Sequence, residues 1–100
     1  MKVETNAPKS FALYQNHPNP FNPETIIRYQ FPQESEVGLT IYNLKGQEIR
    51  TLVDEKKQAG FYNIAWNGKD NAGRQVASGV YIYRIQIGDF TGVKKLTLLR

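Results

Sequence analysis

The chain has 100 residues, of which 40% are hydrophobic and 22% are charged, and this composition is typical of one compact domain rather than two. The absence of Cys excludes a disulfide framework and thiolate metal sites. The formal net charge of +4 comes from basic residues scattered along the chain. Charge distributed in this way favours solubility and indicates no particular partner.

The N-terminal segment has no features of a folded element. Residues 1–10 are polar, contain Pro8, and lack both periodicity and the apolar centre of a signal peptide. We interpret them as a linker or an overhang, and residues 11–100 as the domain. No stretch of the chain approaches the roughly 20 apolar residues of a membrane helix, so we expect no membrane insertion.

The domain begins with a short apolar run at residues 11–15. An octapeptide with three prolines follows at residues 16–23. Proline lacks an amide donor and disrupts helices, so the octapeptide is predicted to be a rigid, extended loop. Phe21 lies among these prolines, and we expect it to be tucked under the domain as a plug rather than offered to a partner.

The rest of the chain has the pattern of strands separated by turns. Large apolar residues recur with a period of two, on one face of a strand, at residues 25–31, 37–42, 60–66 and 80–87. Residues 48–53 fit either a helical turn or a strand, and the flanking glycines favour an edge strand. Gly88 and Asp89 predict a tight hairpin turn into a last strand within residues 90–100. About seven strands in all indicate an all-β fold, an immunoglobulin-like antiparallel β-sandwich.

Groups that could carry chemistry are scarce. The sequence has one His and no Cys, and no nucleophile stands beside a base at a spacing known from enzymes. We therefore expect no enzymatic activity and no cofactor. The oxygen-rich residues 67–73 raise a calcium hypothesis, but Asp70 is their single carboxylate and Lys69 lies beside it. We expect these side chains to hold consecutive turns, with calcium left open.

The aromatic residues raise two classes of ligand, nucleic acid and carbohydrate. Nucleic acid is not expected, because most aromatic residues fall on the apolar side of their strands and no basic cluster exceeds the pair Lys94 and Lys95. Exposed Tyr14, Tyr42 or Phe61 on a sheet face would stack on sugar rings, so a weak carbohydrate contact stays open.

Several motifs together are similar to one known family. They are PNPFNP at residues 18–23, TIIRY at 25–29, VGLTIYNLKG at 37–46, WNG at 66–68, SGVYIYR at 78–84 and KLTLLR at 95–100. In this order they resemble the type A C-terminal sorting domain of proteins exported by the type IX (Por) secretion system of Bacteroidetes and related bacteria. Residues 66–85 also resemble the immunoglobulin-like module of flagellar hook-capping proteins. Asn67 stands where many relatives have Asp, which argues against an acidic site there.

The resemblance implies a non-catalytic secretion signal. Such a domain would follow an N-terminal cargo, be recognised by the outer-membrane translocon, and have a surface sorting peptidase as a further partner, with cleavage of the domain left open. The cargo would pass through the periplasm and the outer membrane to the cell surface or the medium. The expected partner-binding residues are Lys94, Lys95, Leu98, Leu99 and Arg100, and the expected motif loop is Pro18, Asn19, Pro20, Phe21, Asn22 and Pro23. The alternative is a carbohydrate-binding or structural spacer module of a multidomain secreted enzyme.

Overall fold

Seven strands occur in the part of the chain that the structure describes, residues 7–100 of the computed structural model. Residues 1–6 of the predicted linker lie outside the described residues. The strands are β1 (Ala12–Leu13), β2 (Thr25–Phe31), β3 (Ser35–Tyr42), β4 (Glu48–Lys57), β5 (Gly60–Trp66), β6 (Gly79–Ile87) and β7 (Phe90–Leu98). Within residues 7–100 we find no helix that is long and apolar enough to cross a membrane.

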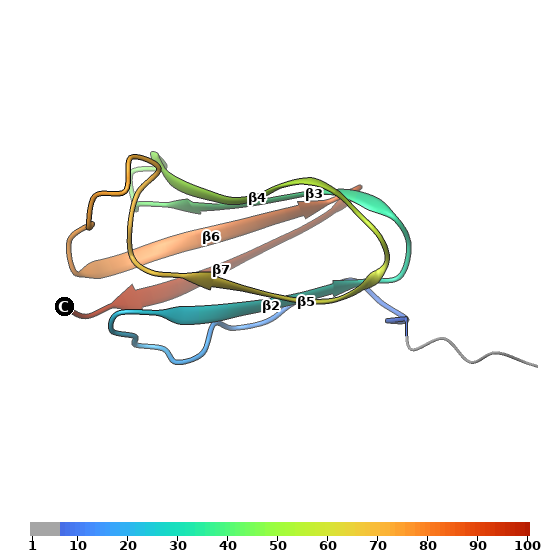
Figure 1. The fold of residues 1–100 in the computed structure, drawn as a ribbon, viewed down its shortest axis with the longest axis horizontal. Coiled ribbons are helices and arrows are strands. Elements are labelled where there is room, and N and C mark those ends of the chain that lie inside the picture. Colours follow the sequence, from blue (N-terminus) through green and yellow to red (C-terminus); the bar gives the residue numbers. More distant parts are fainter. Residues whose placement is uncertain (1–6) are drawn as a thin grey trace, which may run out of the picture.

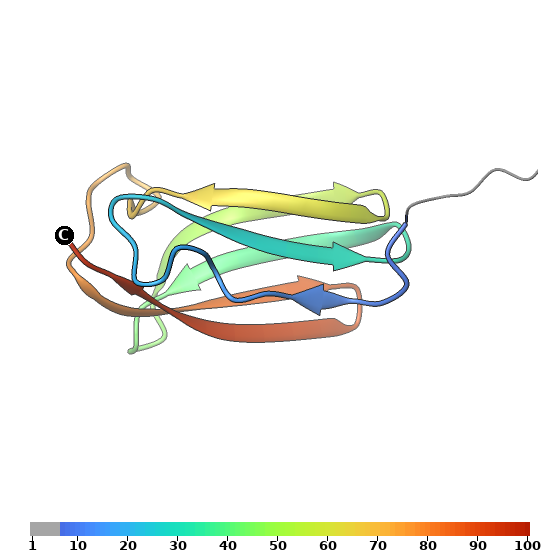
Figure 2. The same cartoon turned by 90° about the horizontal axis from the view of Figure 1, so that it is seen from below.

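The strands form two antiparallel sheets that lie one over the other (Figures 1 and 2). One sheet has three strands in the order β1-β2-β5, and the other has four in the order β4-β3-β6-β7. All neighbouring strands run antiparallel. This arrangement confirms the predicted immunoglobulin-like antiparallel β-sandwich of about seven strands.

The core lies between the two sheets and consists of the alternate residues that the period-two pattern predicts to face inward. On β2, β3 and β6 these buried side chains are Ile27, Tyr29, Phe31, Val37, Leu39, Ile41, Tyr81, Tyr83, Ile85 and Ile87. Trp66 packs at one end of the core, where its ring lies 5.7 Å from the ring of Phe21 and 5.7 Å from that of Tyr81, centroid to centroid. Each fully buried apolar side chain stabilises the fold by about 1.5–3 kcal/mol.

Strand β4 is an edge strand, as predicted, but it is longer than residues 48–53. Its last four residues, 54–57, are all charged and so lack the apolar alternation that marks a strand. They are extended because residues 35–38 of β3 pair with them. Register shifts after Leu39 and Ile41 interrupt this pairing, and they account for the ambiguous pattern of residues 48–53.

The proline loop, residues 16–23, packs against the sandwich. Phe21 is only 2% exposed and fills the end of the core beside Trp66, which confirms the expected plug. The loop is not extended throughout, since it bends at residues 18–20 and again at 22–23. These bends are needed because the chain has to carry Phe21 inward and then return to β2. Figure 2 shows this segment, in blue, passing alongside the red strand β7.

The residues just before the domain also contact it. Pro8 is buried, and the carbonyl oxygen of Ser10 accepts a hydrogen bond from Nε2 of Gln30 at 3.2 Å. Phe11 stacks on Phe90 of the last hairpin with ring centroids 5.5 Å apart. The packed part of the chain therefore extends back into the predicted linker as far as Pro8.

Candidate partner-binding edge of the last strand

The predicted docking residues lie on or just after β7, where neighbouring side chains point to opposite faces of the sheet. Leu98 is fully buried together with Leu96, so the structure places it in the core and corrects its expected place on a surface. Lys94 is on the same side of the strand as Leu96, whereas Lys95 points to the outer face. The two lysines therefore do not form one basic patch.

The outer face of β7 presents a different set of side chains. Val93 is 56% exposed and Leu99, just past the strand, is 53% exposed, with Lys95 between them. Val93 was not among the predicted docking residues. The sequence does contain the signal that would have found it, because Val93 is an odd number of residues away from both Leu96 and Leu98, the core positions.

The C-terminal end of the β7 backbone edge is covered by the proline loop. The amide of Thr97 donates to Oδ1 of Asn19 at 2.9 Å, and its carbonyl oxygen accepts the amide of Phe21 at 3.0 Å. The amide of Leu99 donates to the carbonyl oxygen of Phe21 at 3.0 Å. A strand added here would need these same groups, so the motif loop caps this part of the edge.

Nearer the start of β7 the edge carries fewer hydrogen bonds, although Leu13 of β1 packs against Gly92 there. Nε2 of Gln15 donates to the carbonyl oxygen of Lys95 at 2.6 Å. Because ladder hydrogen bonds alternate, Thr91 and Val93 present their backbone groups to the same side as Thr97. Among residues 7–100, no backbone group pairs with them on that side. We call the backbone of residues 91–95 the open edge.

Arg100, the last predicted docking residue, is bound to the domain itself. Its Nε donates to the carbonyl oxygen of Val76 at 2.7 Å, and its Nη2 donates to that of Gly68 at 2.6 Å. Its amide donates to Oγ of Ser78 at 2.9 Å. The guanidinium therefore ties the end of the chain to the turns of residues 67–79, and the chain around Leu99 is held in place on both sides.

The oxygen-rich turns contain the expected hydrogen bonds between side chain and backbone. Oδ1 of Asp70 accepts the amides of Arg74 and Ala72, and these bonds, that of Arg74 foremost, lower the pKa of this carboxyl. Oδ1 of Asn71 accepts the amide of Thr51 in β4 at 3.0 Å. The turns are thus held as predicted, and Asn71 caps the edge of the other end strand.

Buried hydrogen bonds fix the start of the proline loop to β6. The hydroxyl of Tyr83 donates to the carbonyl oxygen of Tyr14 and accepts the amide of Asn16, both at 2.8 Å. Burial raises the pKa of Tyr83 to about 12. Nδ2 of Asn16 donates to Oγ1 of Thr25 at 3.0 Å. Sequence patterns do not reveal this network, because Asn16 and Tyr83 are far apart along the chain.

Two solved structures from Porphyromonas gingivalis contain a similar fold. One is the dimeric latent PorU, with a TM-score of 0.71 and 19% identity over 97% of this chain. The other is PorZ, described as an essential bacterial surface component of the type-IX secretion system, with a TM-score of 0.59 and 16% identity over 90% of this chain. This chain spans 10% of the PorU chain and 11% of the PorZ chain. At these identities the likeness shows the fold alone.

The family comparison is more specific. No curated protein matches this chain significantly in sequence. Residues 23–88, more than half of the chain, match the family model of the FlgD Ig-like domain. The match runs from the end of the proline loop to the β6–β7 turn and includes the Trp66 region that resembles hook-capping proteins. The chain therefore belongs to the FlgD Ig-like domain family.

Proposed function

We propose that this domain is a non-catalytic C-terminal sorting signal, which the outer-membrane type IX translocon recognises in its folded form. It would direct a fused N-terminal cargo through the periplasm to the cell surface or the medium, where a sorting peptidase removes it. Two observations support this: the motifs from residue 18 to residue 100, and the fold shared with PorU and PorZ. PorZ is described as an essential surface component of the type-IX secretion system, and PorU comes from the same bacterium.

The observation that carries the proposal is the way in which the last strand is held. Its end is fixed to the sandwich by Phe21 and Arg100, while residues 91–95 keep backbone groups without a partner strand among the described residues. Such an edge offers main-chain hydrogen bonds to a receptor strand, and alternate side chains supply specificity. We assign the docking surface to the open edge with Val93, Lys95 and Leu99.

This assignment revises the expected docking residues. Lys95 and Leu99 remain, Val93 joins them, and Leu98 and Arg100 serve to hold the strand in place. Lys94 lies on the core-facing side of β7 and is set apart from the others. The motif loop contributes indirectly, since its caps on Thr97 and Leu99 confine strand addition to residues 91–95.

The absence of catalysis is part of the proposal. The carboxylate of Asp70 accepts amide hydrogen bonds that hold turns. The pKa of Tyr83 is raised by burial, and its hydroxyl is used in structural hydrogen bonds. The hydrogen bonds of both groups are explained by the fold, without a catalytic role. The domain would therefore act through recognition alone.

The test is export of a reporter protein fused ahead of this domain in a bacterium with an active type IX system. The variant Val93→Ser with Lys95→Glu changes the outer face of β7 and leaves the core intact. A matched control, Leu44→Ser with Lys45→Glu, changes an exposed apolar residue and a lysine in the β3–β4 turn. We expect the β7 variant to retain its reporter in the periplasm and the control to export it.

The test requires two measurements on each variant, its folding and its export. Circular dichroism of both purified variants has to match the parent domain, so that loss of export reflects loss of docking. Deleting residues 93–100 would be a poor test, since it removes Leu96 and Leu98 from the core. Export of the folded β7 variant at the parent level would overturn the assignment. If removing the whole domain also left export unchanged, the spacer alternative would replace the sorting signal.

A further inference from the structure

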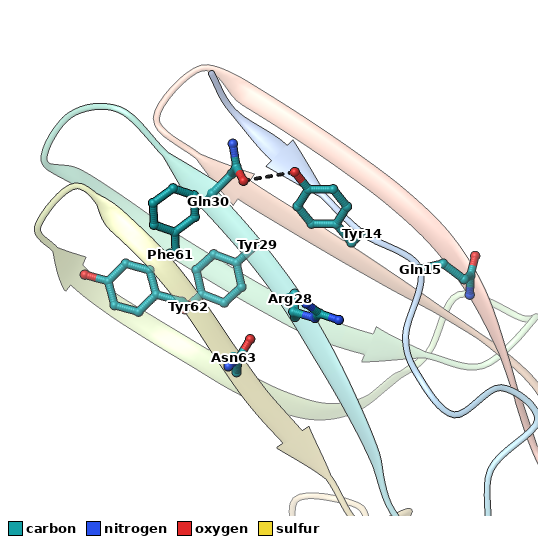
Figure 3. Close-up of a pocket in the computed structure, with 8 residues that line it drawn as sticks. All are labelled: Tyr14, Gln15, Arg28, Tyr29, Gln30, Phe61, Tyr62 and Asn63. Carbon is teal, nitrogen blue, oxygen red and sulfur yellow. Dashed lines mark hydrogen bonds between the residues drawn. The ribbon is translucent and has the colours of Figure 1, made fainter. Parts of the chain in front are cut away.

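An open pocket lies on the outer face of the three-stranded sheet, on the side away from the core (Figure 3). Its volume is 610 Å³, within the range of about 300–1,000 Å³ usual for small-molecule sites. Its outward-facing lining consists of Tyr14, Gln15, Arg28, Gln30, Phe61 and Asn63. The docking side chains of β7 lie on the outer face of the other sheet, and Gln15, whose Nε2 donates to the carbonyl oxygen of Lys95, lies between the open edge and the pocket.

Two exposed aromatic rings stand on opposite sides of the pocket. Tyr14 follows β1 and is 47% exposed, and Phe61 lies on β5 and is 64% exposed. β2 runs between these strands, so the backbones that carry the two rings are about 10 Å apart, two strand spacings. The hydroxyl of Tyr14 donates to Oε1 of Gln30 at 2.9 Å, which orients its ring, and Figure 3 shows Gln30 between the two aromatic side chains.

Neither aromatic ring contributes to the core. Phe61 pairs across the sheet with Gln30. On β5 its side chain points to the exposed face, opposite to the face of buried Trp66. The stacked ring pairs in the described part of the chain include neither Phe61 nor Tyr14. Exposed aromatic faces of this kind offer a flat apolar surface to a ligand.

The polar groups between the rings determine the chemistry of that ligand. Arg28 and Asn63 are directly paired neighbours on β2 and β5, and both are exposed. Within residues 7–100 the Arg28 guanidinium forms no ion pair, and no acidic side chain lines the pocket. A guanidinium binds a carboxylate through two parallel hydrogen bonds, and an amide both donates to and accepts from hydroxyl groups.

We propose that this pocket binds an acidic polysaccharide through a hexuronic acid unit. The apolar face of the sugar ring would stack on Phe61 or Tyr14, the carboxylate would pair with Arg28, and the hydroxyl groups would bond to Asn63. Single-stranded nucleic acid fits less well, because it needs cations along the backbone and this pocket has one. The inference goes beyond the sorting function and does not depend on it.

The test is affinity electrophoresis of the whole chain through gels that contain polygalacturonate, at physiological ionic strength. The variants are Phe61→Ala and Arg28→Gln, and the matched controls are Leu44→Ala and Arg84→Gln, which change an exposed apolar residue and an exposed arginine elsewhere. We expect each pocket variant to weaken binding about tenfold or more, as loss of a charged hydrogen bond or a stacking contact does, and the controls to stay within about twofold.

The chain has a net charge of +4, so it would also be attracted to any polyanion. The control variants distinguish binding in the pocket from this general attraction. No retardation of the parent chain by polygalacturonate would overturn the proposal. Equal weakening by Arg28→Gln and Arg84→Gln would also overturn it, since net charge alone would then explain the binding. A neutral dextran gel is expected to retard the chain less. Equal or stronger retardation by oligo-dT would replace the sugar with nucleic acid.

Discussion

Replacement of Phe21 by Ala tests whether the proline loop stabilises the domain or merely lies on it. The side chain is 2% exposed and contacts Trp66 at the end of the core. Truncating a buried Phe to Ala typically costs about 3–5 kcal/mol, from lost burial and from the cavity left behind. Because the site lies at the end of the core, where the loop is able to collapse partly, we expect the lower part of that range, about 3 kcal/mol.

The measurement is urea denaturation of the parent and of Phe21→Ala, followed by circular dichroism. Phe61→Ala is the matched control: it removes the same side chain from a position that is 64% exposed, and we expect a change within about 0.5 kcal/mol. Amide hydrogen exchange adds a local readout. If the loop detaches, the amides of Thr97 and Leu99 lose their acceptors, Oδ1 of Asn19 and the carbonyl oxygen of Phe21, and should exchange faster than those elsewhere in β7.

Two results would refute this reasoning. A loss below about 1 kcal/mol for Phe21→Ala would mean that Phe21 is not part of the core. Unchanged exchange at Thr97 and Leu99 in a destabilised variant would mean that the loop remains on the edge of β7 without its anchor. In the second case the capping of that edge would not depend on burial of the plug.

Three further predictions follow from buried groups and edge caps. Trp66→Ala is expected to lower the free energy of unfolding by about 3–5 kcal/mol in the same urea assay, and a loss below about 1 kcal/mol would contradict its core position. Burial raises the pKa of Tyr29 and of Tyr83 to about 12. An unfolded chain loses these protons near pH 10, so the stability that they contribute is complete below about pH 10 and is lost as the pH rises toward 12. The urea midpoint should therefore fall between about pH 10 and pH 12. It should fall less steeply with pH in Tyr83→Phe than in the parent, and an equal slope in the two proteins would contradict the raised pKa of Tyr83. Asn71→Ala removes the acceptor of the Thr51 amide at the edge of β4, so we expect a loss of about 1 kcal/mol and faster exchange at Thr51, whereas an unchanged rate would contradict the cap.

The pattern of hydrophobic residues was sufficient to predict the sandwich. Within residues 25–31 and 80–87 a large apolar residue recurs at every second position, as in a strand with one buried face, and both strands appear with the predicted residues inward. Gly88 and Asp89 predicted the last hairpin because a two-residue hairpin turn requires a positive φ, which Gly tolerates, and Gly88 adopts a φ of 56°. Local steric rules and burial are enough for these elements.

The candidate site was less predictable. Lys94 and Lys95 read as a pair along the sequence, yet the alternation of β7 separates them, and Leu98 belongs to the core. The same rule applied to residues 91–99 would have predicted Val93 on the outer face and Leu98 on the inner one. The ambiguity of residues 48–53 has another cause, since register shifts against β3 cannot be read from one strand.

The sequence by itself determined most of the strands, their inward faces and the turns, because these depend on residues close together in the chain, whereas the end of β4 depends on its pairing with β3. Only the tertiary structure decided which strand edges are covered: Asn19 and Phe21 on β7, and Asn71 on β4. It also decided that Tyr14 and Phe61 share one face and that Arg100 is used to hold the chain end. These arrangements join residues distant in sequence, and hydrogen bonds between them depend on how the two sheets stack, which no local pattern encodes.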